Sequence, residues 1–111
     1  MSLTTHVLDA VHGRPAEGLG VRWETRDGAA WLPVAVAGTD ADGRVRTWDP
    51  DAPLVAGVHR LVFDTGAWFA DRGRPTFYPE VVLVFAVTDP AAHHHVPLLL
   101  SPFAYSTYRG S

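Results

Sequence analysis

Hydrophobic and polar residues alternate with a period of two in several short segments of the chain. The clearest is Gly20–Arg26, in which Val21, Trp23 and Thr25 face one side and the charged residues between them face the other. This period is typical of a β-strand that buries one face and leaves the other in water. An Asp-Gly pair follows the segment and predicts a tight turn into the next strand.

Similar segments recur between turns that contain glycine, proline and aspartate. They predict about eight strands: Thr5–Val11, Gly20–Arg26, Trp31–Ala37, Arg44–Trp48, Val58–Asp64, Glu80–Val87, His95–Leu100 and Phe103–Tyr108. Thr65 is the expected N-cap of a single short helix that runs to Asp71 and is closed by Gly73. Short strands separated by tight turns are typical of a sandwich, so the sequence predicts an all-β fold with one short helix.

The segment Glu80–Val87 differs from the other predicted strands because it is apolar at almost every position. Such a run is expected of a strand that is buried on both faces or covered by a partner chain. It is the first indication in the sequence that the protein associates with itself.

The length of the chain limits its organisation and its setting. A chain of 111 residues has room for one hydrophobic core, so we expect a single domain over residues 1–111. No apolar run approaches the roughly 18 to 20 residues that cross a bilayer, and no export signal precedes the first strand. We therefore expect no membrane partner and a cytoplasmic location.

The charged residues and the absence of cysteine exclude several functions. Nine arginines stand against 12 acidic residues, for a net charge of -3, and there is no lysine. The arginines are scattered among aspartates rather than gathered in a basic stripe, which argues against a nucleic-acid partner. Without cysteine, the chain has no disulfides, thiolate catalysis or cysteine-ligated metal sites.

The six histidines offer the most chemistry in the sequence, and three of them are consecutive. His93 and His95 would point to the same side of a strand, as two metal ligands do. No third ligand with the usual helical spacing accompanies them, so we expect no metal and interpret His93 and His94 as exposed loop residues. His95 begins a strand and is the one expected to face a cleft.

Three further features stay open when they are judged from the residues alone. His6 lies among apolar neighbours, where a packed and hydrogen-bonded histidine is the commoner outcome. Arg44 follows a TDADG turn, where an arginine is usually solvated or paired with a nearby aspartate. The segment Tyr108–Ser111 would be a frayed tail unless the preceding aromatic residues tie it down.

Considered together, these segments resemble a known family. The stretches LTTHVLDAVHGRPAEGL at 3–19, TDADGR at 39–44 and HHVPLLLSPFAYSTYRGS at 94–111 are similar to the 5-hydroxyisourate hydrolases of the transthyretin-like family. The resemblance extends through TGAWFADRG at 65–73 and PTFYPEVVLVF at 75–85. Its most specific element is the YRGS ending, which separates the hydrolases from the hormone-carrying transthyretins of the same fold.

The resemblance implies a transthyretin-like sandwich of two four-stranded sheets. Paired edge strands would form a dimer, and two dimers would pack into a homotetramer with the active sites at their contact. The family's two histidines fall on His6 and His95, its arginine on Arg44 and its terminal tyrosine on Tyr108. The family more often has an aromatic residue where this chain has His94.

The implied activity is hydrolysis of 5-hydroxyisourate, the unstable product of urate oxidation, to a ureidoimidazoline carboxylate without a cofactor. Opening the ring amide needs an activated water, a stabiliser for the oxyanion and a proton for the leaving nitrogen. Imidazoles move protons near neutral pH, and a guanidinium fork holds a planar substrate. The expected catalytic residues are His6, Arg44, His95 and Tyr108, and the expected substrate-binding residues are His6, Arg44, Tyr108, Arg109 and Ser111.

Two other classes of function remain open. The first is a transthyretin-like carrier that holds a small aromatic ligand in the channel between dimers without turning it over. The second is a sandwich that binds a metal through His93 and His95. The motifs at both ends of the chain favour the hydrolase over either alternative.

Overall fold

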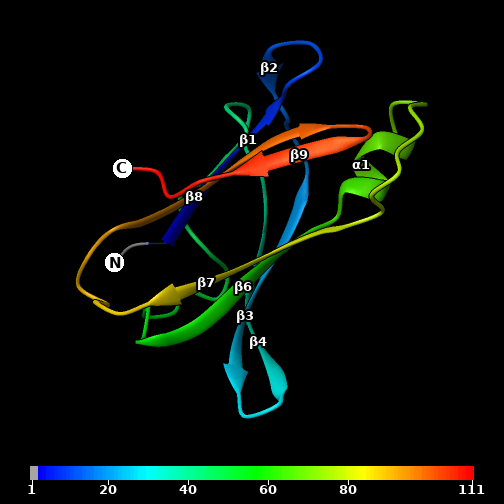
Figure 1. Ribbon diagram of the computed structural model, residues 1–111. Helices are drawn as coiled ribbons and strands as arrows, with labels where there is room; N and C mark the ends of the chain where they lie inside the picture. The colour runs from blue at the N-terminus through cyan, green and yellow to red at the C-terminus, as the bar shows by residue number, and fades with distance from the viewer. Residues whose placement is uncertain (1–2) are drawn as a thin grey trace.

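The computed structural model describes residues 3–111, which form two β-sheets and one short helix (Figure 1). The strands are β1 (Leu3–Asp9), β2 (Arg14–Pro15), β3 (Gly20–Asp27), β4 (Ala30–Gly38), β5 (Arg44–Val45), β6 (Gly57–Phe63), β7 (Val81–Val87), β8 (His94–Ser101) and β9 (Ala104–Thr107). Helix α1 spans Thr65–Ala70. The predicted all-β architecture is confirmed. Among residues 3–111, no helix is long and apolar enough to cross a membrane.

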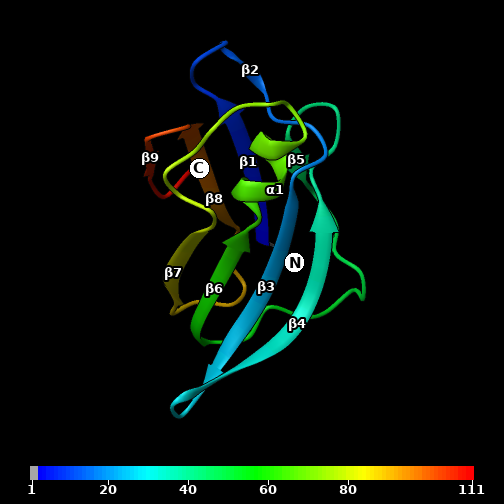
Figure 2. The same cartoon turned by 90° about the vertical axis from the view of Figure 1, so that its right-hand side faces the viewer.

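The two sheets differ in size. One has five strands in the order β2-β1-β8-β9, with β5 also paired to β1, and the other has four in the order β4-β3-β6-β7 (Figure 2). The expected pair of four-stranded sheets is therefore wrong by one strand. The reason is that two strands of only two residues, β2 and β5, follow one another along the same edge of β1. Strand β5 also ends at Val45, well before the expected Trp48.

Strands β1 and β8 form the centre of the five-stranded sheet and run parallel to each other. The residues of β1 alternate between buried and half-buried, and Leu3, Thr5 and Val7 point into the core. The even-numbered residues of β1 therefore lie on the outer face of the sheet, because successive side chains of a strand point to opposite faces. This outer face is where the candidate site is found.

The core between the sheets is built on aromatic residues. Trp23, Phe63 and Phe69 are fully buried, and the Trp23 ring packs against Trp48 with 5.5 Å between ring centroids. His59 lies in the same core, 1% exposed. Its Nδ1 accepts a hydrogen bond from the Trp23 indole at 3.1 Å, and its Nε2 lies 2.8 Å from the Val55 carbonyl. His59 is thus a neutral structural histidine with both ring nitrogens satisfied.

Strand β7 buries one face only. Val81, Leu83 and Val87 are buried, whereas Val84 is 56% exposed. Of the two outcomes expected for this strand, burial on both faces does not hold within one chain, and cover by a partner chain stays a prediction. Strand β7 is also the last strand of its sheet, where an exposed edge is available to a partner.

Helix α1 begins one residue earlier than expected. Asp64 is its N-cap, and the Asp64 carboxylate accepts a hydrogen bond from the backbone N–H of Ala67 at 3.4 Å. Thr65, the expected cap, is the first helical residue and donates its hydroxyl to the Tyr78 carbonyl at 2.8 Å. This bond ties the helix to the segment that leads into β7.

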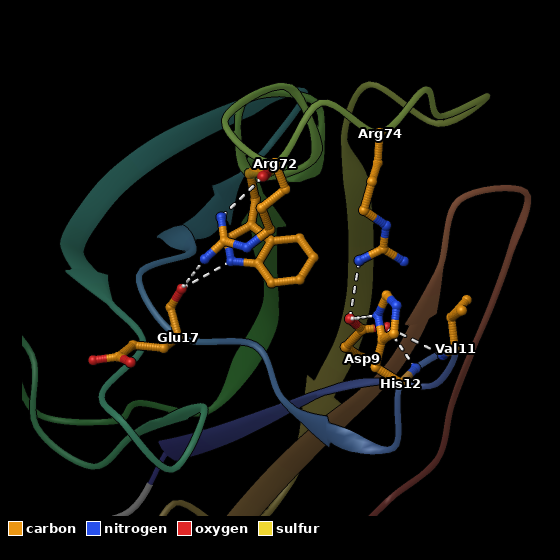
Figure 3. A network of polar contacts seen from close by, with 7 residues as sticks. Asp9, Val11, His12, Glu17, Arg72 and Arg74 are labelled. Atoms are coloured by element: carbon orange, nitrogen blue, oxygen red, sulfur yellow. Dashed lines mark hydrogen bonds and ion pairs between the residues drawn. The ribbon is translucent and has the colours of Figure 1, made fainter.

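The carboxylate of Asp9 joins the end of β1 to the segment after α1 (Figure 3). It accepts hydrogen bonds from Arg74 Nη1 at 2.9 Å and from the backbone N–H of Val11 at 3.1 Å, and His12 Nδ1 lies 2.9 Å away. Burial alone would raise the pKa of Asp9, but the bonds from Arg74 and His12 outweigh it and lower the pKa from 3.8 to about 2. Asp9 is therefore a buried anion that holds two loops together.

Candidate functional site

The outer face of β1 supplies the first candidate residue, His6. Strand β5 pairs antiparallel with β1 and places Arg44 directly opposite His6. Directly opposite residues of an antiparallel pair project their side chains to the same face. The imidazole and the guanidinium are therefore neighbours on the outer surface, although they are far apart in the sequence.

The TDADG turn places Arg44 at the start of β5. The Asp40 carboxylate accepts hydrogen bonds from the backbone N–H groups of Asp42 and Arg44, each at 2.9 Å. Gly43 adopts a positive φ of 74°, and a Cβ at this position would collide with the Val7 carbonyl oxygen. The turn thus needs both its aspartate and its glycine to bring Arg44 against β1.

Strand β8 brings the third candidate, His95, to the same face. The parallel register pairs His95 with Thr4 on β1, and His95 Nδ1 lies 2.8 Å from the Thr4 hydroxyl. The His93 ring stacks on the His95 ring with 6.2 Å between centroids and 13° between planes. The expectation that His93 and His95 point to one side is confirmed.

The chain end docks beside His95 instead of fraying. Gly110 forms an isolated β-bridge with His95, and its backbone N–H donates to the His95 carbonyl at 2.9 Å. A Cβ on Gly110 would collide with the His95 ring, so the close approach requires glycine. The backbone therefore holds Ser111 next to the site.

Two cavities meet at His95. One is a cleft of about 310 Å³ on the outer face of the five-stranded sheet, and its lining residues are Thr4, Thr5, Arg44, Arg46, His93, His95 and Ser111. The other, of about 350 Å³, lies along β7 and is also lined by Tyr108 and Arg109. The structure thus brings Arg44, His95 and Ser111 together, whereas Tyr108 and Arg109 lie on the other side of His95.

Both candidate histidines are less basic than an ordinary imidazole. Burial lowers the pKa of His6, and the Arg44 guanidinium lowers it further. Burial also lowers the pKa of His95, followed by the charges of Arg44, His93 and His6. Each ring therefore favours the neutral form more than an ordinary imidazole does, and the neutral form is the one that accepts a proton.

His94 does not behave as expected. We expected an exposed loop residue, but His94 is 5% exposed because it is the first residue of β8 and its side chain points inward. Its Nδ1 lies 2.9 Å from the Ala92 carbonyl, and the residue lines the cavity along β7. His94 thus occupies the face of β8 opposite to His93 and His95.

The sequence analysis overlooked three residues of the cleft, Thr4, Thr5 and Arg46. Thr4 lies two residues before His6 on one strand, so the period of two could have placed it on the same face. Arg46 is held at the rim by Asp40, with 2.6 Å between Nη1 and the carboxylate oxygen. Within residues 3–111, no group of three or more histidines and carboxylates is placed to hold a metal ion.

The arrangement of the two sheets is that of the transthyretin-like proteins, with which it shares TM-scores of 0.86 and 0.87. The profile of the HIUase/Transthyretin family matches residues 3–110. The chain belongs to this family.

Individual relatives are similar over nearly their whole length. The 5-hydroxyisourate hydrolase of Caulobacter vibrioides is 48% identical over 113 residues, which cover 98% of this chain and 97% of that protein. The structure of Klebsiella pneumoniae 5-hydroxyisourate hydrolase has a TM-score of 0.86 at 41% identity and covers 100% of both chains. Sea bream transthyretin in complex with thyroxine has a TM-score of 0.87 at 32% identity, covering 99% of this chain and 95% of that one.

Proposed function

We propose that this protein hydrolyses 5-hydroxyisourate by opening its six-membered ring at an amide bond, a step of urate degradation. The hydrolase from Caulobacter vibrioides, at 48% identity, supports the activity. The observation that carries the proposal is that His6, Arg44 and His95 converge on one face of one sheet from three different strands. Such a group has the chemistry that amide hydrolysis requires and that a carrier does not need.

The histidines activate water in this mechanism. The oxygen of water bonds to the amide carbonyl carbon while an imidazole takes a proton from it, and the ring C–N bond then breaks as the leaving nitrogen receives a proton. His95 is the better placed base, because its Nδ1 is engaged by Thr4 and Nε2 is left for water. His6, paired in register with Arg44, orients the substrate and the water.

Arg44 stabilises the negative charge in this mechanism. Its guanidinium lines the cleft with His95 and presents a planar fork of donors to a planar, electron-rich substrate. The charge that develops on the carbonyl oxygen is then neutralised by a group that is already in place. After burial, the same positive charge is the next cause that lowers the pKa of both histidines, so Arg44 both stabilises the oxyanion and favours the neutral form of the base.

The tail completes the binding site. Ser111 lines the cleft with Arg44, and the bridge between Gly110 and His95 holds it there. Tyr108 and Arg109 line the cavity that shares His95 with the cleft, so they reach the substrate from the far side of this ring. Tyr108 donates a hydrogen bond to the substrate, and Arg109 contributes a positive charge.

The assembly we propose is a homotetramer of single-domain chains. Strands β7 and β9 are the last strands of their sheets, and edges of this kind pair readily with a second copy. Large apolar side chains are exposed near them, including Val84 at 56%, Phe103 at 66% and Phe77 at 71%. A dimer formed through these edges leaves the cleft facing outward, where a second dimer covers it.

The decisive experiment follows the ultraviolet absorbance of freshly generated 5-hydroxyisourate, made with urate oxidase, after this protein is added. We expect the wild type to accelerate the decay of 5-hydroxyisourate. With His6→Ala or Arg44→Ala, we expect the substrate to decay at its spontaneous rate. Size-exclusion chromatography and circular dichroism of each variant provide the controls for assembly and folding. A variant that lacks residues 108–111 tests the tail and should lose most of the activity.

The alternative function is that of a carrier, because sea bream transthyretin shares the fold and was solved with thyroxine bound. The same experiment separates the two functions. If the folded, assembled wild type leaves the decay of 5-hydroxyisourate unchanged, the hydrolase proposal fails and small aromatic ligands become the next probes.

A further inference from the structure

The hydroxyl group of Thr4 lies between two imidazole rings. Its Oγ1 is 2.8 Å from Nδ1 of His95 and 3.2 Å from Nε2 of His93. Both distances are those of hydrogen bonds. The three groups come from β1, from β8 and from the residue before β8, and the parallel register of β1 and β8 brings them together.

The chemistry of a hydroxyl group restricts how these bonds are arranged. A threonine hydroxyl has one proton to donate and can accept from other donors, while a neutral imidazole donates from one nitrogen and accepts at the other. In the first arrangement, His95 Nδ1–H donates to Thr4 and Thr4 donates to His93. In the second, His93 Nε2–H donates to Thr4 and Thr4 donates to His95 Nδ1.

The two arrangements give His95 opposite roles. In the first, Nε2 of His95 carries a lone pair and can take a proton from water. In the second, Nε2 carries the proton and can give it to a leaving nitrogen. The direction of the Thr4 hydroxyl therefore decides which of these roles His95 has.

We propose that Thr4 and His93 form a proton relay behind His95: when His95 takes a proton from water on Nε2, its Nδ1 side passes a positive charge through Thr4 to His93, and the charge returns when His95 gives its Nε2 proton to the leaving nitrogen. This inference rests on the proposed function, and it assigns Thr4 and His93 as positioning residues that act through His95. Neither residue contacts the substrate in this scheme.

The relay balances in protons and charge. His95 Nε2 takes a proton from water and becomes an imidazolium. Its Nδ1 proton passes to Thr4 Oγ1 while the Thr4 proton passes to His93 Nε2, so the positive charge moves to His93 and His95 keeps its proton on Nε2. After His95 donates that proton to the leaving nitrogen, the two transfers reverse and the first arrangement is restored.

The surroundings favour the transfer of charge away from His95. Facing this ring from the neighbouring strands are Arg44 on β5 and His6 on β1, and Arg46 also lines the cleft. Each positive charge near His95 makes an imidazolium there less favourable. His93 is exposed to solvent, so water stabilises the charge once it has moved.

The kinetic test compares Thr4→Val, which is close to isosteric, with Thr4→Ser, which keeps the hydroxyl. We expect Thr4→Val to lower kcat by roughly 10-fold or more with little change in KM, since general acid-base catalysis contributes about 10²-fold or more. Thr4→Ser should keep most of the wild-type kcat. The matched control is Thr88→Val, at an exposed position outside the cleft, which should behave as the wild type.

Coupling between the two residues distinguishes a relay from a packing effect. His93→Phe keeps an aromatic ring for stacking but cannot hold the proton, and we expect it to lower kcat and change the pH profile of kcat. The double variant Thr4→Val with His93→Phe should lose no more than Thr4→Val alone, because the two residues act as one unit. Losses that multiply would overturn the proposal.

Nitrogen-15 NMR of the histidine rings tests the relay without substrate. In the wild type we expect the nitrogen shifts of His93 Nε2 and His95 Nδ1 to show hydrogen bonds to the Thr4 hydroxyl, and in Thr4→Val we expect these shifts and the tautomer ratio of His95 to change. Unchanged spectra overturn the relay whatever the activity is. If the wild type leaves 5-hydroxyisourate untouched, the proposed function fails while the spectra still decide whether the coupling exists.

Discussion

The buried carboxylate of Asp9 makes a specific prediction about stability. Asp9→Asn keeps the size and shape of the side chain but removes its charge. The side chain of Asp9 is 4% exposed, and that of its partner Arg74 is 19% exposed. Nη2 of Arg74 has no hydrogen-bond partner among residues 3–111. The buried positive charge of this guanidinium is therefore compensated by the Asp9 carboxylate. We therefore expect the variant to be clearly less stable than the wild type.

The magnitude follows from the pKa of Asp9. Its pKa falls from 3.8 to about 2 on folding, and each unit is worth about 1.4 kcal/mol. The charged form therefore stabilises the fold by about 2 kcal/mol at neutral pH. Because the folded pKa is the lower one, this contribution is complete above the unfolded pKa and is lost as the pH falls through the folded pKa. Near pH 3, about half of it remains.

Urea denaturation at several pH values between 7 and 2.5 measures this contribution. We expect Asp9→Asn to lower the free energy of unfolding by about 2 kcal/mol at pH 7 and by progressively less below pH 4. Protein concentration is held constant, because association adds to the measured stability. The control is Asp51→Asn, which replaces an exposed aspartate. A difference between wild type and Asp9→Asn that is the same at pH 7 and pH 3 would refute the reasoning.

Three further predictions concern activity on 5-hydroxyisourate. Arg44→Lys should lose most of the activity without unfolding, since an ammonium cannot reproduce the donor fork; steady-state rates with circular dichroism check this, and wild-type rates would contradict it. Gly110→Ala should lower activity while the cooperativity of thermal unfolding is kept, because the added Cβ displaces the tail from the His95 ring; an unchanged rate would show that the contact is unimportant. On acidification, kcat/KM should fall with a midpoint below 6.5, the ordinary histidine pKa, because the pKa values of His6 and His95 are both lowered. A midpoint above 6.5 would contradict the charge environment described above.

Local patterns in the sequence were sufficient to predict most of the strands. The alternation in Gly20–Arg26 is preserved in β3, where Val21 and Trp23 are buried and Arg22 and Arg26 are exposed. Such alternation is a property of neighbouring residues, because successive side chains of a strand point to opposite faces whatever it pairs with. The resemblance to the family likewise identified His6, Arg44 and His95 as candidates before any contact was known.

The errors arose where pairing between distant segments decides the outcome. Strand β2 was missed because two residues cannot display a period, and it exists only because β1 offers an edge. The strand expected at Arg44–Trp48 is present but ends at Val45, because it pairs with β1 over two residues only. His94 was expected in a loop because it belongs to a polar run, yet the extent of β8 turns its side chain inward. None of these features is encoded in the residues immediately around it.

The all-β class, the turns and the residue types available for chemistry follow from local sequence patterns. Which of those residues meet depends on the pairing of distant strands. The antiparallel register of β5 sets Arg44 against His6, the parallel register of β8 sets His95 against Thr4, and the bridge at Gly110 brings the tail to the same place. The physical reason is that register depends on long-range hydrogen bonds and on the burial of whole faces, which no local stretch of sequence specifies.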